Sequence, residues 1–428
     1  MTVGAVQSVP SAGPGWRAWM MWGIGASCFA YAFFHRVLPS VMVGELMRDF
    51  SVGGAILGNL SALYFYIYAG MQIPIGMAID RWGTRYVLAT AVAIAAFGSL
   101  LFAFAPSLEV AYLGRLAIGL GSAVGFVGTL ALIATWFPHN RFAFMAGMTM
   151  LVAMAGGVLG QAPMAPVVDA IGWRNTLLAA GAYAVLLAIV IWLVVRDRPA
   201  GIPAPPKATG GMRGLGRDLR QVASNPQYWI LAAYGCAMSG PMLSYAALWG
   251  VPHMMTKFDI ERPLAAFSAS ILLIGWAMGS PLSGWLSDHI GRRKLPCILA
   301  AAIQVVLWPI ILYADLPLYV VWGLLFVAGL VGSTMIVCFA AAREMSPLRM
   351  RGAATAFVNC FSVAAGALMQ PAIGWLLDRN WDGVMADGAR VYSAVTYDAA
   401  LLSLPILVGL AFLLSFLIRE TWCRPLEA

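Results

Sequence analysis

Long apolar runs alternate with short polar segments along the whole chain. Each of twelve runs is long enough to cross a bilayer, which takes about 20 residues in a helix. Helices are expected because an open strand edge cannot satisfy its backbone hydrogen bonds in hydrocarbon. The pattern predicts an all-α membrane protein with twelve transmembrane helices, at residues 17–43, 54–79, 86–106, 109–136, 143–168, 175–195, 227–254, 265–286, 295–314, 317–341, 351–376 and 398–418.

The longest polar connection, residues 196–226, divides these runs into two sets of six. It is rich in proline and glycine and carries a basic cluster at Arg213, Arg217 and Arg220. Such a composition is typical of a linker between two packed units. We therefore expect an N-terminal six-helix bundle over residues 1–195, a cytoplasmic linker over 196–226 and a C-terminal six-helix bundle over 227–428.

Basic residues are distributed unevenly between the two sides that these helices define. With the N-terminus inside, 18 of the 26 lysines and arginines lie in inner segments, in agreement with the positive-inside rule. Charged residues make up only 10% of the chain, whereas soluble domains carry roughly 25%. The net charge of +8 is therefore a topology signal and argues against a nucleic-acid role. We expect a multi-pass protein of the inner (plasma) membrane with both termini cytoplasmic.

The most charged loop of the first half has a counterpart in the second half. Gly76 and Asp80 are each followed, 208 residues later, by the same residue type at Gly284 and Asp288. Other landmarks repeat at almost the same spacing, since Gln370 follows Gln161 by 209 residues. A motif repeated near half the chain length indicates a tandem duplication. The two six-helix bundles are thus expected to be pseudo-symmetric.

Arg36 is the most informative charged residue within a predicted span. It lies about 10 Å below the outer end of the first helix, where a charge costs about 2.5 kcal/mol or more. Capture of a carboxylate or phosphate on a solute would compensate that charge. The alternative is an arginine that extends to the outer interface, helped by an early helix end at Pro39. Arg115, in the outer third of the fourth helix, is expected to reach the interface and not to contact the solute.

Polar side chains on otherwise apolar helices are further candidates for a solute site. On the second helix, Tyr64, Tyr68 and Gln72 fall on one face together with Ser61. Such a stripe faces either a cavity or a neighbouring helix, and the sequence leaves both open. The same two interpretations apply to the remaining candidates, which are Gln161, Tyr245, Trp249, Asn359 and Gln370.

The repeated loop motif and its context resemble the major facilitator superfamily, over nearly the whole chain. A second motif that resembles this superfamily is Gly114-Arg115 followed by Gly119 and Gly121 on the fourth helix. The resemblance implies alternating access between the two bundles. It also implies a gating role for the loop residues, although a plain basic loop without a switching function remains the alternative. These gating candidates are Gly76, Asp80, Arg81, Arg85, Gly284, Asp288 and Arg292.

Within that superfamily, the segment from Phe33 to Arg36 with Pro39-Ser40 is similar to the first helix of organic-anion and sugar-phosphate permeases. An arginine there holds the substrate anion. The fourth helix is similar to that of bacterial amino-acid permeases and the lysosomal dipeptide transporter. The fifth helix lacks the glycine-proline motif of antiporters, which lowers the expectation of a drug exporter.

We therefore expect a monomeric secondary transporter of a small polar or anionic solute, such as an amino acid, a short peptide or a carboxylate. A phosphorylated solute is less favoured because the seventh helix offers no second basic residue. A drug or metabolite exporter and a non-transporting membrane sensor are the alternatives. No acidic residue lies mid-span, so coupling to a proton stays open, as do the exact solute and the direction of transport. No enzyme motif, cofactor motif or metal cluster is recognisable.

Overall fold

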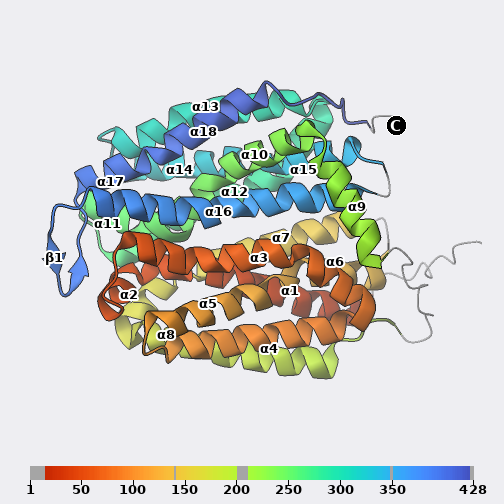
Figure 1. Ribbon diagram of the computed structural model, residues 1–428, viewed down its shortest axis with the longest axis horizontal. Coiled ribbons are helices and arrows are strands. Elements are labelled where there is room, and N and C mark those ends of the chain that lie inside the picture. The colour runs from red at the N-terminus through yellow and green to blue at the C-terminus, as the bar shows by residue number, and fades with distance from the viewer. Residues whose placement is uncertain (1–14, 139–140, 200–210, 348–349, 425–428) are drawn as a thin grey trace, which may run out of the picture.

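The computed structural model describes residues 15–138, 141–199, 211–347 and 350–424, which form two groups of helices lying side by side (Figure 1). The lower group in that view comes from the first half of the chain. Its elements are α1 (Trp16–Val37), the 3-10 helix η1 (Leu38–Val41), α2 (Val43–Asp49), α3 (Gly54–Trp82), α4 (Thr84–Ala103), α5 (Leu108–Ser122), α6 (Val124–Trp136), α7 (Phe142–Leu159) and α8 (Met164–Val194).

The upper group comes from the second half and begins after α9 (Gly211–Ala223), a short helix beside α16. It contains one π-helix, η3 (Met242–Trp249), and one two-stranded hairpin. Its other elements are α10 (Pro226–Pro241), α11 (Gly250–Phe258), α12 (Arg262–Ile290), α13 (Lys294–Tyr313), α14 (Leu318–Gly332), η4 (Ser333–Met335), α15 (Ile336–Glu344), α16 (Arg351–Arg379), β1 (Met385–Ala386), β2 (Ala389–Arg390), α17 (Ala394–Leu401) and α18 (Ser403–Ser415).

The length and composition of the helices can be compared with the predicted number of spans. Within the described residues, eight helices are long and apolar enough to cross a bilayer, or ten if each of two bent pairs counts as one span. The expected total of twelve is therefore not confirmed. The run at 143–168 falls on the shorter helix α7 and the start of α8, and the run at 227–254 is divided by η3. The all-helical membrane architecture itself agrees with the prediction.

The two ends of the molecule differ, and we call them the hairpin end and the linker end. The hairpin end carries α2 and the antiparallel pair β1–β2, in which Met385 faces Arg390 (Figure 1). The linker end carries α9 and the C-terminal residues. At the linker end, α3 and α12 both stop at a glycine with positive φ, 88° at Gly83 and 71° at Gly291. Glycine adopts this conformation without strain, so the motif glycines end equivalent helices.

The two groups touch most closely where α3 lies against α16. A Cβ atom added at Gly58 would lie 2.4 Å from the carbonyl oxygen of Gln370, and one added at Gly374 would lie 2.1 Å from that of Gly54. Both distances are shorter than van der Waals contact, so only glycine allows this approach. Residues near the N-terminus of α3 and the C-terminus of α16 thus form a glycine seam, defined here as Gly54, Gly58 and Gly374, which closes the hairpin end.

Candidate functional site

Arg36 lies at the end of α1, and aromatic rings enclose its guanidinium. The residue is only 4% exposed. Its guanidinium carbon lies 4.2 Å from the ring centroid of Phe33, 5.0 Å from that of Tyr68, and 5.6 and 5.7 Å from those of Phe65 and Tyr64. Desolvated cation–π contacts contribute up to about 2 kcal/mol. The side chain is therefore held in the interior and does not extend to a membrane interface.

Two donor groups of this guanidinium are unpaired. The Nε and Nη2 atoms of Arg36 are buried and have no hydrogen-bond partner. No ion pair reaches Arg36 within the described ranges. Leaving a buried donor of a charged group unsatisfied costs about 1–3 kcal/mol or more. Aromatic faces offset part of the charge but do not accept these N–H bonds as an oxygen would, so the site is suited to a bound anion.

The structure brings the polar stripe of the second predicted helix to Arg36. Tyr64 and Tyr68 on α3 present their rings to the guanidinium, and the two rings stack 5.8 Å apart. The Tyr64 hydroxyl donates to the carbonyl of Ala32 at 2.9 Å, so its ring and not its hydroxyl is directed at the site. Gln72, one turn beyond Tyr68, is 9% exposed, and its amide lies 3.5 Å from the Tyr68 carbonyl.

Arg115 on α5 supplies a second buried guanidinium, contrary to the sequence expectation. It is 1% exposed, so it does not reach the interface. Its guanidinium carbon lies 5.1 Å from the ring centroid of Tyr64, the ring that also contacts Arg36. Nη1 donates to the carbonyl of His35 at 2.8 Å, whereas Nε and Nη2 are buried without a partner. The seventh predicted helix offers no basic residue to accompany Arg36, but the fourth predicted helix does, because it carries Arg115.

Four other predicted solute ligands lie on η3, on α16 and in the turn between α7 and α8, and most of their polar groups are already paired. Gln161 donates to Ser40 at 3.1 Å and to the carbonyl of Ala246, and it accepts from Ser270 at 3.2 Å. The remaining pairs are Gln370 Nε2 to Leu243 O at 2.7 Å, Trp249 Nε1 to Gln370 O at 3.0 Å and Tyr245 Oη with His253 Nδ1 at 2.9 Å. These side chains join helices and leave little free for a solute.

Asn359, the last predicted ligand, is half-buried on α16. No hydrogen bond of its side chain is recorded within the described part of the chain. It makes no recorded polar contact with Arg36 or with the stripe on α3. The structure therefore provides no direct link between Asn359 and the guanidinium site.

The loop motifs at the linker end are mostly exposed. Asp80 and Arg81 are exposed, and Asp80 has no ion pair among the described residues. Arg85 donates through Nε to the carbonyl of Trp192 at 2.8 Å. Cβ atoms added at Gly76 or Gly284 would meet open space, so no neighbouring helix approaches closely at these two glycines.

The second copy of the motif is held more tightly than the first. Asp288 pairs with Arg293 at 2.6 Å, and Arg293 also pairs with Glu344 at 2.7 Å. Burial alone would lower the pKa of Arg293, but its hydrogen bonds to Glu344 and Asp288 raise it overall. Arg292 lies over the ring of Trp422 at 5.0 Å. All of these contacts stay within the second half of the chain.

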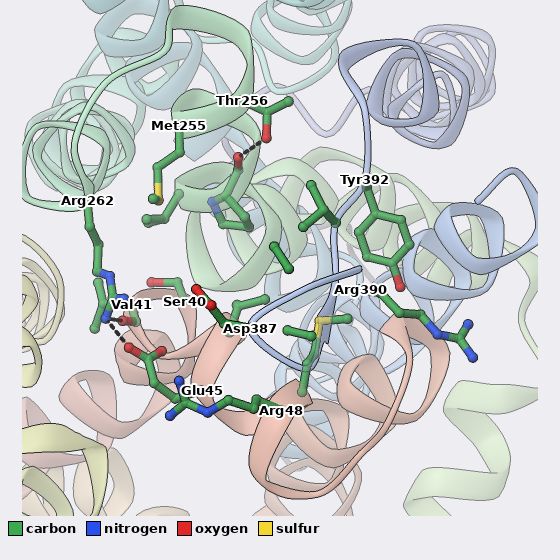
Figure 2. Close-up of a pocket in the computed structure, with 18 of the residues that line it drawn as sticks. Ser40, Val41, Glu45, Arg48, Met255, Thr256, Arg262, Asp387, Arg390 and Tyr392 are labelled. Carbon is green, nitrogen blue, oxygen red and sulfur yellow. Dashed lines mark hydrogen bonds and ion pairs between the residues drawn. The ribbon is translucent and has the colours of Figure 1, made fainter. Parts of the chain in front are cut away.

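At the hairpin end, polar contacts do join the two groups of helices. Arg262 on α12 contacts Glu45 at 2.6 Å, Asp169 at 3.3 Å and the carbonyl of Val41 at 3.0 Å. Figure 2 shows Arg262 directed at Glu45 and Val41, and all three residues line a pocket of about 390 Å³. The pocket lies between α2, α11 and the β1–β2 hairpin.

Asp378, at the C-terminal end of α16, makes a second cross-connection. Its carboxylate accepts from the backbone N–H groups of Gly54 and Ala55 at the start of α3, both at 2.9 Å. It also accepts from the Tyr392 hydroxyl at 2.6 Å and pairs with Arg390 at 2.9 Å. Burial and the neighbouring carboxylate raise the pKa of Tyr392, so this phenol stays protonated and donates. A helix N-terminus favours a carboxylate, so this contact stabilises the closed hairpin end.

Comparison with known families decides what kind of protein carries this site. The family model of the Major Facilitator Superfamily matches residues 23–250 and 238–422, which together cover most of the chain. The chain belongs to the Major Facilitator Superfamily. As a member of this superfamily it is a multi-pass membrane transport protein with a small-molecule substrate, and the resemblance inferred from the loop motifs is confirmed.

Individual relatives of this superfamily member differ in what they handle. The chain is 25% identical over 408 residues to the membrane sensor protein UhpC of Salmonella typhimurium, with 89% of each chain covered. It is 27% identical over 285 residues to the probable sulfoacetate transporter SauU of Cupriavidus necator, with 63% of this chain and 65% of that protein covered. It is 22% identical over 409 residues to the probable galactarate/D-glucarate transporter GudP of Bacillus subtilis, with 87% and 88% covered.

Solved structures of the superfamily agree with the fold. A bacterial homologue of the human lysosomal transporter Spinster, in an inward-facing and unoccupied conformation, superposes with a TM-score of 0.75. That comparison covers 95% of this chain and 98% of the other, at 17% sequence identity. At this identity the likeness establishes the fold alone.

Proposed function

We propose that this protein is a secondary transporter that moves a small organic anion across the plasma membrane by alternating access. The observation that carries the proposal is the enclosed guanidinium of Arg36, whose Nε and Nη2 have no partner in the described structure. A solute carboxylate or comparable oxyanion would accept from both groups. The bond geometry of guanidinium and carboxylate suits this pairing.

The surroundings of Arg36 favour organic acids over amino acids and peptides. An amino group on the solute would carry a positive charge, and it would be best placed beside a carboxylate. No acidic residue lies in the middle of a predicted span, and none forms an ion pair with Arg36 among the described residues. The proposed solute is therefore an organic acid whose charge is entirely negative.

The closed hairpin end supports a proposal for orientation. Polar contacts of Arg262 and Asp378 join the two halves there, whereas the charged loop motifs at the linker end pair only within one half. Because most basic residues lie at the linker end, we place that end in the cytoplasm, together with both termini. The structure would then represent an inward-facing state of a monomer. The proposal also includes gating by the loop motifs and coupling to a proton.

The decisive experiment measures anion binding and uptake with purified, full-length protein. Organic carboxylates are expected to raise its thermal stability and to enter proteoliposomes that contain it. Arg36→Ala should remove most of both effects, because it removes one of the two guanidiniums beside Tyr64 and leaves aromatic rings in its place. Arg343→Ala, which removes an exposed arginine on α15, is the matched control and should behave as the wild type. Equal uptake by the Arg36→Ala protein would refute the proposal.

A second candidate function is solute sensing without transport. The similarity to a protein named as a membrane sensor over 89% of both chains favours it. A sensor would bind the anion through Arg36 as a transporter would, but it would not move it. Anion-dependent thermal stabilisation without any uptake into proteoliposomes would support this alternative over transport.

A further inference from the structure

The two buried guanidiniums of the site present the same edge. In an arginine side chain, Nε and Nη2 carry two N–H groups that point the same way, and this edge forms two parallel bonds to one oxyanion. In both Arg36 and Arg115, these are the two atoms left without a partner. The Nη1 atom of Arg115 is used differently, since it donates to the carbonyl of His35 at 2.8 Å. Each arginine therefore has one complete, unused anion-binding edge.

The two guanidiniums lie close to each other, because both contact the same aromatic ring. Both guanidinium carbons contact the ring of Tyr64, at 5.7 Å for Arg36 and 5.1 Å for Arg115, so they are no farther apart than these two distances combined. The carbonyl that Arg115 holds belongs to His35, the residue directly before Arg36. The buried hydroxyl of Ser61, one turn before Tyr64 on α3, also has no partner. Donors without acceptors thus gather around a single aromatic ring.

Charge balance decides how many anionic groups fit. Neither arginine forms an ion pair within the ranges that the structure describes. A solute with one negative charge would compensate one guanidinium and leave the other buried and unpaired, which is strongly unfavourable. A solute with two anionic groups would satisfy both edges and both charges.

We infer that the solute carries two anionic groups, as a dicarboxylate or a sulfonate-carboxylate does, with one group bound by Arg36 and the other by Arg115. This inference rests on the proposed function and deepens it, because it names the solute class of the same site. Arg115 becomes a specificity-determining residue: it distinguishes solutes with two acidic groups from those with one. Arg36 is required for either kind.

The experiment compares matched pairs of acids on the full-length protein in detergent. The probes are succinate with butyrate, glutarate with valerate, and sulfoacetate with acetate, and the readout is binding by isothermal titration. The dianion of at least one pair should bind about tenfold or more tightly than its partner, as expected from an added charge-assisted contact. Arg115→Gln should remove most of this preference, because it should weaken binding of the dianion more than binding of its monoanion partner.

Two further variants keep the outcomes distinct. Arg36→Gln should weaken both members of each pair, whereas the exposed control Arg343→Gln should change neither. Should Arg115→Gln not fold, Arg115→Lys serves in its place, since a lysine keeps the charge but lacks the two-donor edge. The wild-type ratio also tests the inference without any variant.

Each result has a separate meaning. If monoanions bind as tightly as their dianion partners, the inference is overturned while the proposed anion transport stands. If Arg115→Gln leaves the preference intact, Arg115 is not the second ligand and the inference fails as stated. If no anion of either kind binds, the proposed function itself is overturned.

Discussion

The single residues of the site lack the counter-charges that buried arginines normally have. Arg36 and Arg115 lie among aromatic rings, whose faces attract a cation but cannot accept two parallel N–H bonds. The shape of the side chain should therefore matter as much as its charge. Lysine carries the same charge on a compact ammonium group and cannot form the paired bonds of a guanidinium.

Replacing Arg36 by lysine should separate charge from geometry. We expect Arg36→Lys to retain anion binding but to weaken it by about tenfold or more, because one charge-assisted bond is lost. Arg36→Gln should bind the same anion more weakly than Arg36→Lys does, because it also lacks the charge. Titration of both variants with the same carboxylate checks this. Equal affinities for the lysine variant and the wild type would mean that only charge is recognised.

The sequence identified one of the two guanidiniums and misjudged the other. Arg36 was predicted from its depth in the first span together with the stripe that contains Tyr64 and Tyr68. Arg115 was assigned to the interface because depth along one helix does not tell which neighbours cover it. The signal was Gly119, one turn further on: a Cβ there would lie 2.8 Å from the carbonyl of Tyr64. This glycine lets α5 approach α3, and the approach buries Arg115.

Among the helical elements, η3 is a π-helix. A π-helix shifts the backbone hydrogen-bond pattern, and such segments occur often at functional sites. The carbonyls of Leu243 and Ala246 in η3 accept from the side-chain amides of Gln370 and Gln161 respectively. Gln370 and η3 belong to the same half of the chain, but Gln161 reaches η3 from the other half. When the halves separate, the hydrogen bond of Gln161 to η3 must break, whereas that of Gln370 can stay.

Removing each glutamine in turn should reveal that difference. Gln161→Leu is expected to favour opening of the hairpin end by about 1–2 kcal/mol, because bonds to Ala246 and Ser270 across the halves are lost. Gln370→Leu should reduce thermal stability without this shift. The measurement is the distance between spin labels at Gly44 and Thr256, which line opposite sides of the pocket, in a cysteine-free background. An equal change in both variants would contradict the assignment.

The hydrophobic pattern predicted the helices better than their interruptions. Apolar runs mark where the chain enters lipid, so the long helices α4, α12, α13 and α16 fall on predicted spans. The pattern does not show where the backbone hydrogen bonds change their spacing, as in η3. Nor does it show where the helical backbone is interrupted, as at Gly172 inside α8, where φ is 78°. These features depend on contacts with neighbouring helices. The π-helix η3 divides the predicted span at 227–254, so no single long α-helix covers it.

For the molecule as a whole, the closed hairpin end is held by contacts between the halves. Asp378 caps the start of α3 and also binds Tyr392 and Arg390, while Arg262 joins Glu45 and Asp169. These partners lie far apart in sequence, and no local pattern pairs them. Opening this end requires all of these contacts to be broken together.

Loss of Asp378 should open the hairpin end. Asp378→Ala removes a helix cap and its two other partners, which we expect to shift the closed–open equilibrium by about 1–2 kcal/mol, a factor of roughly 5–30. Longer distances between spin labels at Gly44 and Thr256 would report the shift. Asp382→Ala, at an exposed carboxylate four residues further on, is the control and should give the wild-type distances.

The exposed carboxylate of Asp80 should act in the state in which the linker end is closed. Asp80 forms no ion pair with the described residues, so we expect its gating contact to form when the linker end closes. Asp80→Asn is therefore expected to lower the maximal uptake rate severalfold while changing solute affinity by less than about twofold. Uptake kinetics in proteoliposomes separate the two parameters, and unchanged kinetics would argue against gating.

The glycine seam has a practical consequence. A methyl group at position 58 or 374 would clash with the facing backbone while α3 and α16 are in contact. It would not clash once the two helices separate. Alanine at either position would thus act as a wedge, trapping the transporter with its outer side open. Such a trapped form would be the natural antigen for raising conformation-selective binders.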